Sequence, residues 1–452
     1  MNGRLEQGTV LRTARGSEVR IESLIGMGGQ GEVYRARSGG RNWALKWYLP
    51  ELTTRAQRVI IEGVVGKNIR DPRFLWPREL VEHPKGPGEG FGYLMELRPA
   101  DFTDLPSLFR RDSTVSAATR RTLLAVALST AESFRYLHKQ GLAYQDINWG
   151  NLFFNPDSGR ILICDNDNAV PDGTPSSVLG TVDFMAPELV RGDPGAFPTT
   201  QTDLHALAVL LFMLLMNHHP LEGAAALRIH CMDAAAKHRL NGTDPVFVFD
   251  PENDTNRPVP GEQDTVLTNW AATPASLRSL FIKAFTVGMR DPLQRVREFE
   301  WRDALREVHD GVVRCPKCRR QNIFESGANA PAVSCWNCSI AIAAPPRLVV
   351  TTGTGRVRVS HTIRVSEEAE VHGFHLDPDP EIHDFTHPVA FVVPHPSMPG
   401  RFGLTNSTTA SWKLHSDDAA GPREVPPGKR AALREGLLIE LGSGAEAVFH
   451  EH

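Results

Sequence analysis

The stretch GLAYQDINWGNLFF, residues 141–154, places an acid and an amide close together just before an apolar run. Asp146 and Asn151 are five positions apart, and Leu152–Phe154 predicts the start of a buried strand. The two side chains therefore offer two oxygen ligands at one point of the chain, next to a strand end.

Length and composition describe an ordinary globular chain with more than one domain. A chain of 452 residues exceeds what one hydrophobic core usually organises, so we expect two or three domains. A hydrophobic content of 41% and a charged content of 23% are typical of soluble globular proteins, not of disordered ones. With a net charge of −4 and no block of Lys and Arg, we expect no nucleic-acid partner.

The chain shows no pattern that predicts secretion or a membrane span. Its first residues, MNGRLEQGTVLRTARG, lack the apolar core of a signal peptide. The most apolar segment, LHALAVLLFMLLM from Leu204, is short for a span and predicts a buried helix. We therefore expect a cytoplasmic protein without a membrane partner.

Strand patterns precede helical patterns along the chain. Ile21 to Trp47 alternates like strands with Gly-rich turns, whereas Ala117–Lys139 and Asp203–Met216 have helical apolar spacing. A segment with cysteines follows, and Pro345-Pro346 marks a break after it. The remainder is rich in Val, Thr, His and Pro and predicts a small β domain.

A glycine-rich turn lies within the strand region. In IGMGGQGEVYRAR, Gly26, Gly28 and Gly31 have the spacing G-x-G-x-x-G, and Val33 follows. Glycines there let backbone N–H groups approach a phosphate, although the pattern alone also fits a tight hairpin turn. Lys46 ends an apolar strand downstream and favours the nucleotide interpretation, because it is placed to reach phosphates beneath the loop.

Several motifs in this order resemble the bacterial Hanks-type, eukaryotic-like Ser/Thr protein kinases. They cover about residues 19–310 and consist of the turn Gly26–Val33, Lys46, and the sequences YQDINWGN, ICDND and LGTVDFMAPE. By this resemblance Asp146 is the catalytic aspartate that accepts or orients the substrate hydroxyl proton. Asn151 and Asp165 would be the Mg²⁺ ligands.

The resemblance also implies a carboxylate partner for Lys46, which clamps the ATP phosphates in these kinases. We expect Glu62, in RAQRVIIEGVVGKNI, to be that partner, and Glu51 is the alternative. The stretch FGYLMELRP resembles the hinge over adenine. The residues expected around ATP are Gly26, Gly28, Gly31, Val33, Ala44, Lys46, Met95, Glu96 and Leu97.

Four further residues match positions outside the ATP site. Thr181 resembles the threonine that Ser/Thr kinases place near the catalytic aspartate, which favours Ser or Thr as the acceptor. Glu188 and Arg295 resemble the ion pair that anchors the C-lobe, and Asp203 resembles the acid opening its central helix. These last three residues are expected to hold the fold, not the substrate.

The chain departs from the family pattern at three places. The usual His-Arg-Asp is Tyr144-Gln145-Asp146, and the usual Asp-Phe-Gly is Asp165-Asn166-Asp167. Asn148 stands where Ser/Thr kinases usually have a lysine, so a cation that would stabilise transition-state charge is missing. Lys46, Asp146 and Asp165 are retained, which favours catalysis over a nucleotide-binding pseudokinase scaffold, the main alternative.

Gln145 bears on control of the activity. In many kinases an arginine at this place pairs with a phosphate on the activation segment. Because a neutral amide gains far less from a phosphate, we expect that phosphorylation at Thr174, Ser176 or Ser177 is not required.

The cysteines form a second constellation. CPKC at Cys315 and Cys318 and CWNC at Cys335 and Cys338 are separated by sixteen residues, a spacing typical of a Cys₄ zinc site. Four thiolates leave no open position, so the site resembles a zinc ribbon in which Zn²⁺ has a structural role. Chance thiols or a redox pair are the alternative.

The C-terminal region distantly resembles forkhead-associated-type β-sandwiches in FGLTNSTTASWKLH and the following strands. The Arg and Ser with which such domains hold phosphothreonine are not identified, so phosphopeptide binding is not implied. The many histidines here have no fixed ligand spacing, and we expect solvated loop histidines instead of a metal site.

The sequence therefore predicts an α+β chain: a bilobal protein-kinase fold, a Cys₄ zinc ribbon and a small, sandwich-like all-β domain. The expected segments are a lead at 1–18, the kinase domain at 19–310 with lobes at about 19–97 and 98–310, the ribbon at 311–344 and the β domain at 345–452. ATP, Mg²⁺ and Zn²⁺ are the expected cofactors, and a protein is the expected substrate. The resemblance also implies a PP2C-type phosphatase and a von Willebrand A-type protein as partners in bacterial signalling. A small-molecule kinase of similar fold remains an alternative, against which the Ala-Pro-Glu segment and Arg295 argue.

Overall fold

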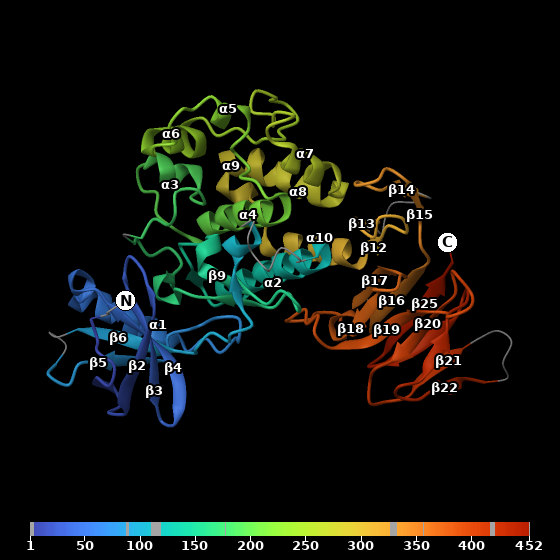
Figure 1. Cartoon of the computed structure of the whole chain (residues 1–452), viewed down its shortest axis with the longest axis horizontal. Helices are drawn as coiled ribbons and strands as arrows, with labels where there is room; N and C mark the ends of the chain where they lie inside the picture. Colours follow the sequence, from blue (N-terminus) through green and yellow to red (C-terminus); the bar gives the residue numbers. More distant parts are fainter. Residues whose placement is uncertain are drawn as a thin grey trace. The chain divides into compact units, whose positions relative to one another are not determined.

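The computed structural model describes residues 4–86, 90–109, 119–176, 178–325, 332–355, 357–415 and 421–451. The chain divides into two compact units, which are described separately (Figure 1). The first unit comprises Met1–Ser116, Tyr136–Pro156 and Arg160–Leu207, and the second comprises Ala117–Arg135, Asp157–Gly159 and Ala208–His452. These units cut across the expected kinase segment, and the helices α2 (Arg120–Lys139) and α4 (Thr200–Met216) are divided between them.

The first unit begins with a closed barrel of antiparallel strands in the order β1-β2-β3-β4-β6-β5. The strands are β1 (Val10–Thr13), β2 (Glu18–Met27), β3 (Gly31–Ser38), β4 (Arg41–Tyr48), β5 (Glu79–Glu82) and β6 (Phe91–Met95). Alternating burial along β3 fits a strand with one face on a core, whereas the second half of β4 is buried throughout.

One helix, α1 (Arg55–Lys67), packs beside this barrel through Ile61 and Val64. It begins at Thr54, whose side chain accepts a hydrogen bond from the Gln57 backbone N–H, and it ends at Asn68 in the left-handed conformation.

The rest of the first unit consists of short elements around the loop that contains Asp146. They are β7 (Thr103–Asp104), β8 (Leu142–Ala143), β9 (Leu152–Phe154), β10 (Ile161–Ile163), β11 (Val170–Pro171) and α3 (Pro187–Arg191). The strand predicted at Leu152–Phe154 is confirmed as β9, which pairs with both β10 and β7.

The helical part of the second unit includes α5 (Ala224–Leu227), α6 (Ala234–His238), α7 (Asp264–Ala271), α8 (Ala275–Phe285), α9 (Val287–Arg290) and α10 (Glu298–Asp310). Phe212 of α4 contacts Phe247, Phe281 and Phe285 edge-on, with ring centroids 5.2–5.9 Å apart, so aromatic packing forms the centre of this helical region. The apolar segment from Leu204 is confirmed as a buried helix. Within the described residues, no helix combines the length and apolarity that crossing a bilayer would need.

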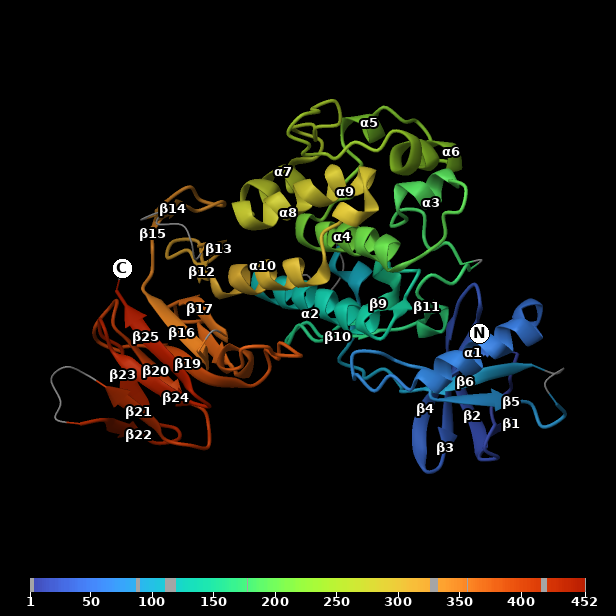
Figure 2. The same cartoon turned by 180° about the vertical axis from the view of Figure 1, so that it is seen from behind.

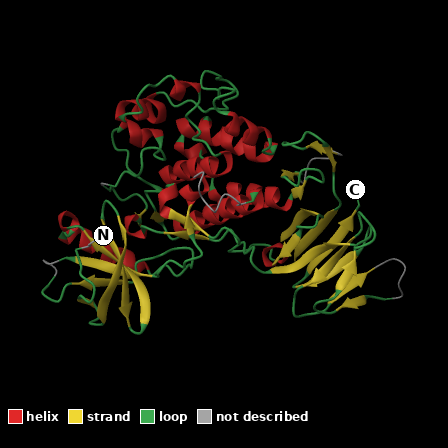
Figure 3. Ribbon diagram, viewed as in Figure 1, coloured by secondary structure: helices red, strands yellow, loops and turns green. Residues whose placement is uncertain are grey.

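The second unit ends in two small hairpins and two sheets, whose strands Figure 3 shows in yellow. The hairpins pair β12 (Val312–Arg314) with β13 (Gln321–Ile323) and β14 (Ala332–Ser334) with β15 (Ala341–Ala343). The six-stranded sheet has the order β17-β16-β25-β24-β21-β22 and the four-stranded sheet has the order β18-β19-β20-β23 (Figure 2). Their strands are β16 (Arg347–Thr354), β17 (Val357–Arg364), β18 (Glu370–His372), β19 (Pro388–Pro394), β20 (Phe402–Asn406), β21 (Trp412–His415), β22 (Arg423–Val425), β23 (Arg430–Ala432), β24 (Leu438–Gly442) and β25 (Ala445–His450). Both sheets contribute to one hydrophobic core, which gives the region a sandwich-like build.

The histidines of this region correct the expectation of solvated loops. His361, His372, His375 and His383 are all at most 3% exposed, and only His387 of the five expected in loops is exposed. Two of them contact acids from helices of the same unit: His375 Nε2 lies 3.2 Å from Asp310, and His383 Nδ1 lies 2.5 Å from Glu132.

Candidate active site and cysteine cluster

The carboxylate of Asp146 is held by side chains from two segments of the first unit. Thr181 Oγ1 donates to it over 2.9 Å, Asn148 Nδ2 over 3.0 Å and Asn151 Nδ2 over 3.3 Å. Asn148 also contacts Thr181 Oγ1 at 3.2 Å and accepts from the Gly150 backbone N–H at 2.8 Å. Asp146 is therefore preorganised, and Asn148 positions it in place of carrying a charge.

The backbone of this loop is fixed by Asp203, which is 1% exposed. Its carboxylate accepts from the backbone N–H groups of Tyr144 at 2.6 Å and Gln145 at 3.0 Å, and His138 Nε2 lies 3.1 Å away. Gln145 has a positive φ of 74°. The hydrogen bonds from the Tyr144 and Gln145 backbone N–H groups to Asp203 hold the backbone in this uncommon conformation. Asp203 therefore fixes the backbone of the loop, and its expected place in the family pattern stays a prediction.

Asn151 and Asp165 offer the oxygen ligands expected of a Mg²⁺ site. Asn151 donates its amide N–H to the carbonyl and carboxylate of Asp146, and no hydrogen bond from the described residues occupies its Oδ1. Asp165 has left-handed backbone angles, φ 50° and ψ 39°, and its Oδ1 lies 3.5 Å from Lys46 Nζ. Burial raises the pKa of Asp165, and the neighbouring Asp167 adds to this, while Lys46 opposes it. Oxygen donors of this kind fit a hard cation.

The glycine-rich turn joins β2 to β3, and its glycines are not equivalent. A Cβ at Gly31 would lie 2.4 Å from the carbonyl oxygen of Trp47, so only glycine fits there. A Cβ at Gly26 or Gly28 would meet no atom closer than 3.8 Å, so these two positions have room for a side chain. Gln30 donates to Asn168 Oδ1 at 3.1 Å and accepts from Lys46 at 2.8 Å.

The residues expected around adenine form one apolar surface. Val33, Ala44, Met95 and Leu97 belong to a single hydrophobic cluster, in which Ala44 and Met95 are paired across β4 and β6. Glu96 lies outside this surface and pairs with Arg41 at 3.0 Å.

The expected pair of Lys46 and Glu62 is not formed, and this part of the sequence prediction is wrong. Among the described residues Lys46 contacts Asp167 at 2.8 Å and Asp165 at 3.5 Å, whereas Glu62 is half-exposed on α1 and lies 3.3 Å from Arg58, one turn away. Glu51, the alternative, is exposed. Of the apolar residues near Glu62, Ile61 and Val64 are buried, whereas Val59 and Ile60 are exposed, so apolar flanks did not indicate burial of the glutamate.

Thr181, Glu188 and Arg295 were also expected at defined places of the kinase pattern. Thr181 contacts Asp146, as described above. Glu188 lies in the first turn of α3, and Arg295 follows the turn at Pro292–Gln294, where its Nε donates to the Gly288 carbonyl at 3.1 Å. The ion pair expected between these two residues stays a prediction. Ser177 lies outside the described residues.

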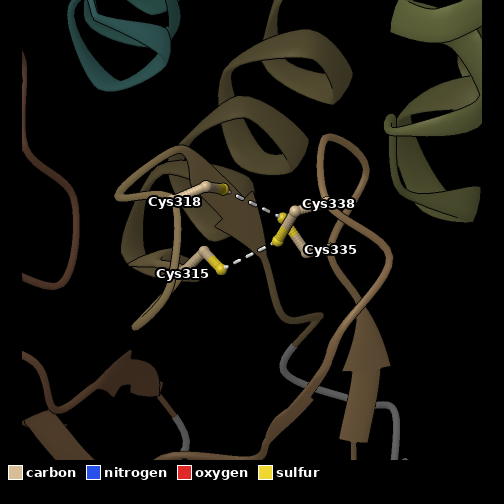
Figure 4. A group of neighbouring side chains, drawn as sticks. All are labelled: Cys315, Cys318, Cys335 and Cys338. Atoms are coloured by element: carbon tan, nitrogen blue, oxygen red, sulfur yellow. Dashed lines mark hydrogen bonds between the residues drawn. The ribbon is translucent and has the colours of Figure 1, made fainter.

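The four cysteines of the two Cys-x-x-Cys motifs meet at one point of the second unit (Figure 4). Cys315 and Cys338 sulfurs are 3.6 Å apart, as are those of Cys318 and Cys335. Zinc bound tetrahedrally at about 2.3 Å places neighbouring sulfurs about 3.8 Å apart, so this arrangement fits the ion closely.

Each cysteine pair sits on the same kind of turn. In the first, Arg319 is left-handed and its N–H donates to the Cys315 carbonyl at 3.0 Å. In the second, Ser339 is left-handed and donates to the Cys335 carbonyl at 2.9 Å. This repetition presents both pairs of sulfurs to a common centre.

Comparison with known proteins agrees with this geometry. A model of the protein kinase domain matches residues 19–264, more than half of the chain, and the chain therefore belongs to the protein kinase domain family. The chain is 29% identical over 225 residues to serine/threonine-protein kinase PknJ of Mycobacterium tuberculosis, covering 46% of this chain and 36% of the relative.

Two other relatives are similarly distant. Serine/threonine-protein kinase PknD of Chlamydia abortus is 23% identical over 308 residues, covering 61% of this chain and 31% of the relative. Serine/threonine-protein kinase PkaA of Streptomyces coelicolor is 24% identical over 253 residues, covering 51% of this chain and 44% of the relative. The chain thus spans less than half the length of each of these relatives.

Sequence reasoning missed the group around Lys46. Asp167, Tyr48 and Tyr93 are all buried, and both tyrosines donate a hydrogen bond to Asp167. The sequence prediction gave none of them a role. The available signal was the acid at Asp167, where the family has glycine.

Proposed function

We propose that this chain is an ATP-dependent Ser/Thr protein kinase that transfers the γ-phosphoryl group to a protein hydroxyl. The observation that carries the proposal is the preorganised carboxylate of Asp146, which takes hydrogen bonds from Thr181, Asn148 and Asn151. A base held in this way orients an acceptor hydroxyl without rearranging during the reaction. The names of the relatives, all serine/threonine-protein kinases, support the acceptor class.

The other residues have complementary roles. Asn151 and Asp165 would hold Mg²⁺, whose positive charge offsets that of the phosphates. Lys46 would contact the ATP phosphates, and the cluster of Val33, Ala44 and Met95 would cover adenine. With no lysine at Asn148, less positive charge faces the transferring group, so we expect a slow kinase.

The proposal is tested by transfer of ³²P from [γ-³²P]ATP to a generic Ser/Thr protein substrate in the presence of Mg²⁺. Asp146→Asn keeps the shape of the side chain and removes the base, and we expect it to abolish transfer. Asp379→Asn makes the same change at an exposed acid of the β region and serves as the matched control. Equal transfer by Asp146→Asn and the wild type would refute the proposal, and a pseudokinase scaffold would then be favoured.

We further propose that Cys315, Cys318, Cys335 and Cys338 bind a structural Zn²⁺ in a ribbon at 311–344, followed by a forkhead-associated-like domain at 345–452. The sulfur geometry supports the first part, and the two packed sheets support the second. A place in bacterial signalling, with a PP2C-type phosphatase and a von Willebrand A-type protein as partners, is proposed from the sequence resemblance alone.

A further inference from the structure

A carboxylate buried beside the ATP site is not used by the mechanism described above. Asp167 lies in the short 3₁₀ turn Asn166–Asn168, and its side chain is fully buried. Lys46 Nζ donates to its two oxygens at 2.8 and 3.0 Å, Tyr48 Oη donates to Oδ2 at 2.5 Å, and Tyr93 Oη donates to Oδ1 at 2.9 Å. Each oxygen of Asp167 is therefore satisfied by donors from β4 and β6.

The donors are buried together with the carboxylate. Lys46 is 4% exposed, Tyr48 1% and Tyr93 0%. A buried carboxylate and a buried ammonium need one another as partners, because leaving either charge unpaired is strongly destabilising.

The two acids of the Asp165-Asn166-Asp167 sequence differ in their surroundings. Asp165 keeps a side chain that is 41% exposed, whereas that of Asp167 is closed off. The more exposed acid can bind an incoming cation, and the buried one can only hold Lys46. Glu62 is not available for that task in this arrangement, since it lies on the flank of α1 with Arg58.

We infer that Asp167 is the positioning residue of Lys46 and takes the place that related kinases give to a glutamate of the helix. Lys46 and the metal-binding Asp165 are then both aligned by one turn of the chain. A consequence is that the position of Lys46 depends on β4, β6 and that turn. This inference rests on the proposed function only for its effect on ATP, because the pairing itself is a property of the protein alone.

The pairing is tested by a double-mutant cycle on the stability of the protein, measured by urea denaturation at neutral pH. If Asp167 holds Lys46, Asp167→Asn lowers the denaturation midpoint more in the wild-type background than in the Lys46→Met background. Glu62→Gln, at the glutamate that pairs with Arg58, should change the midpoint equally in both backgrounds.

The same variants separate a positioning role from a merely structural one. The dissociation constant of Mg·ATP is measured in the wild-type and Lys46→Met backgrounds, which forms a double-mutant cycle. If Asp167 acts through Lys46, Asp167→Asn weakens binding several-fold in the first background and less than twofold in the second. An equal factor in both backgrounds, or a denaturation midpoint that Asp167→Asn lowers equally in both backgrounds, would overturn the inference. A kinase that transfers no phosphoryl group would still give both readouts, so failure of the proposed function is distinguishable.

Discussion

Asn148 places a neutral amide where Ser/Thr kinases usually have a lysine. Where the family has a cation for the transferring phosphate, this chain has an amide that donates to the Asp146 carboxylate and contacts Thr181. Its own carbonyl accepts the Gly150 N–H, which fixes the orientation of the amide. In the proposed kinase this amide would orient Asp146, and it would supply no charge to the transferring phosphate.

Removing this amide should slow the reaction without weakening nucleotide binding. We expect Asn148→Ala to lower kcat about tenfold, or about 1.4 kcal/mol in the barrier, because Asp146 loses one of its donors. The Kd of Mg·ATP should change less than twofold, since Asn148 does not contact the nucleotide surface. Steady-state kinetics with direct binding measurements test this, and an unchanged kcat would contradict it.

At the scale of elements, site residues that are close in the sequence could be predicted to lie together, whereas partners far apart in the sequence could not. Asp146 and Asn151 could be predicted because their five-residue spacing fixes them around one short turn that precedes β9. The partner of Lys46 could not, since Asp167 is 121 positions away and reaches it only through tertiary packing. Burial of His375 was hidden for the same reason, because its acid, Asp310, lies on a different element.

The activation segment offers a test of Gln145. Among the described residues, neither atom of its side-chain amide has a hydrogen-bond partner. We predict that replacing Thr174, Ser176 and Ser177 together by alanine leaves phosphoryl transfer within about threefold of wild type, because a neutral amide gains little from a phosphate. Transfer is measured with the generic substrate, alongside Asp146→Asn. If the triple variant binds ATP but falls to the level of Asp146→Asn, control by the activation segment exists.

The cysteine hairpins offer a test of the metal. We predict about one Zn²⁺ per chain in freshly purified protein, and its loss in Cys315→Ser together with the order of both hairpins. Cys231→Ser, at an exposed cysteine outside the cluster, is the matched control. The zinc content is measured by mass spectrometry. Protein that contains no zinc, although no chelator was used, would contradict the prediction.

At the scale of the whole molecule, the second unit joins the cysteine hairpins and the sheets to kinase helices. Gln321 of β13 accepts from the Arg121 backbone N–H of α2 at 3.1 Å and donates to Glu368 at 3.1 Å. The buried histidines extend this contact through Asp310 of α10 and Glu132 of α2. The hairpins and sheets therefore share a packed interior with α10 and with α2, which lies within the matched kinase domain.

This interior should make the second unit sensitive to acid. Burial lowers the pKa of His361 to about 3, and repulsion by His375, Arg306 and His383 adds to this, while Asp310 opposes it. The unfolded chain binds a proton at His361 below about pH 6.5, and the folded chain does not. The unfolded state then holds more protons, so the free energy of unfolding is constant above about pH 6.5 and falls as the pH decreases towards 3.

The expected slope is up to about 1.4 kcal/mol per pH unit for this histidine. Urea denaturation at pH 7, 6 and 5 measures it, and His361→Gln should flatten the dependence. His387→Gln, at an exposed histidine, is the matched control and should not. Parallel pH dependences for the wild type and His361→Gln would show that burial of His361 does not govern acid stability.

The central claim is that Asp146 makes this chain a Ser/Thr protein kinase. It is tested most directly by incubating a dephosphorylated bacterial proteome with Mg²⁺, [γ-¹⁸O₄]ATP and either the wild type, Asp146→Asn or Asp379→Asn, and then mapping heavy phosphate by mass spectrometry. Because heavy phosphate can come only from the added ATP, every labelled site reports transfer during the incubation. The account predicts labelled Ser and Thr sites with the wild type and Asp379→Asn that are absent with Asp146→Asn. The same labelled sites at the same intensity with Asp146→Asn, or none above that variant with the wild type, would contradict it.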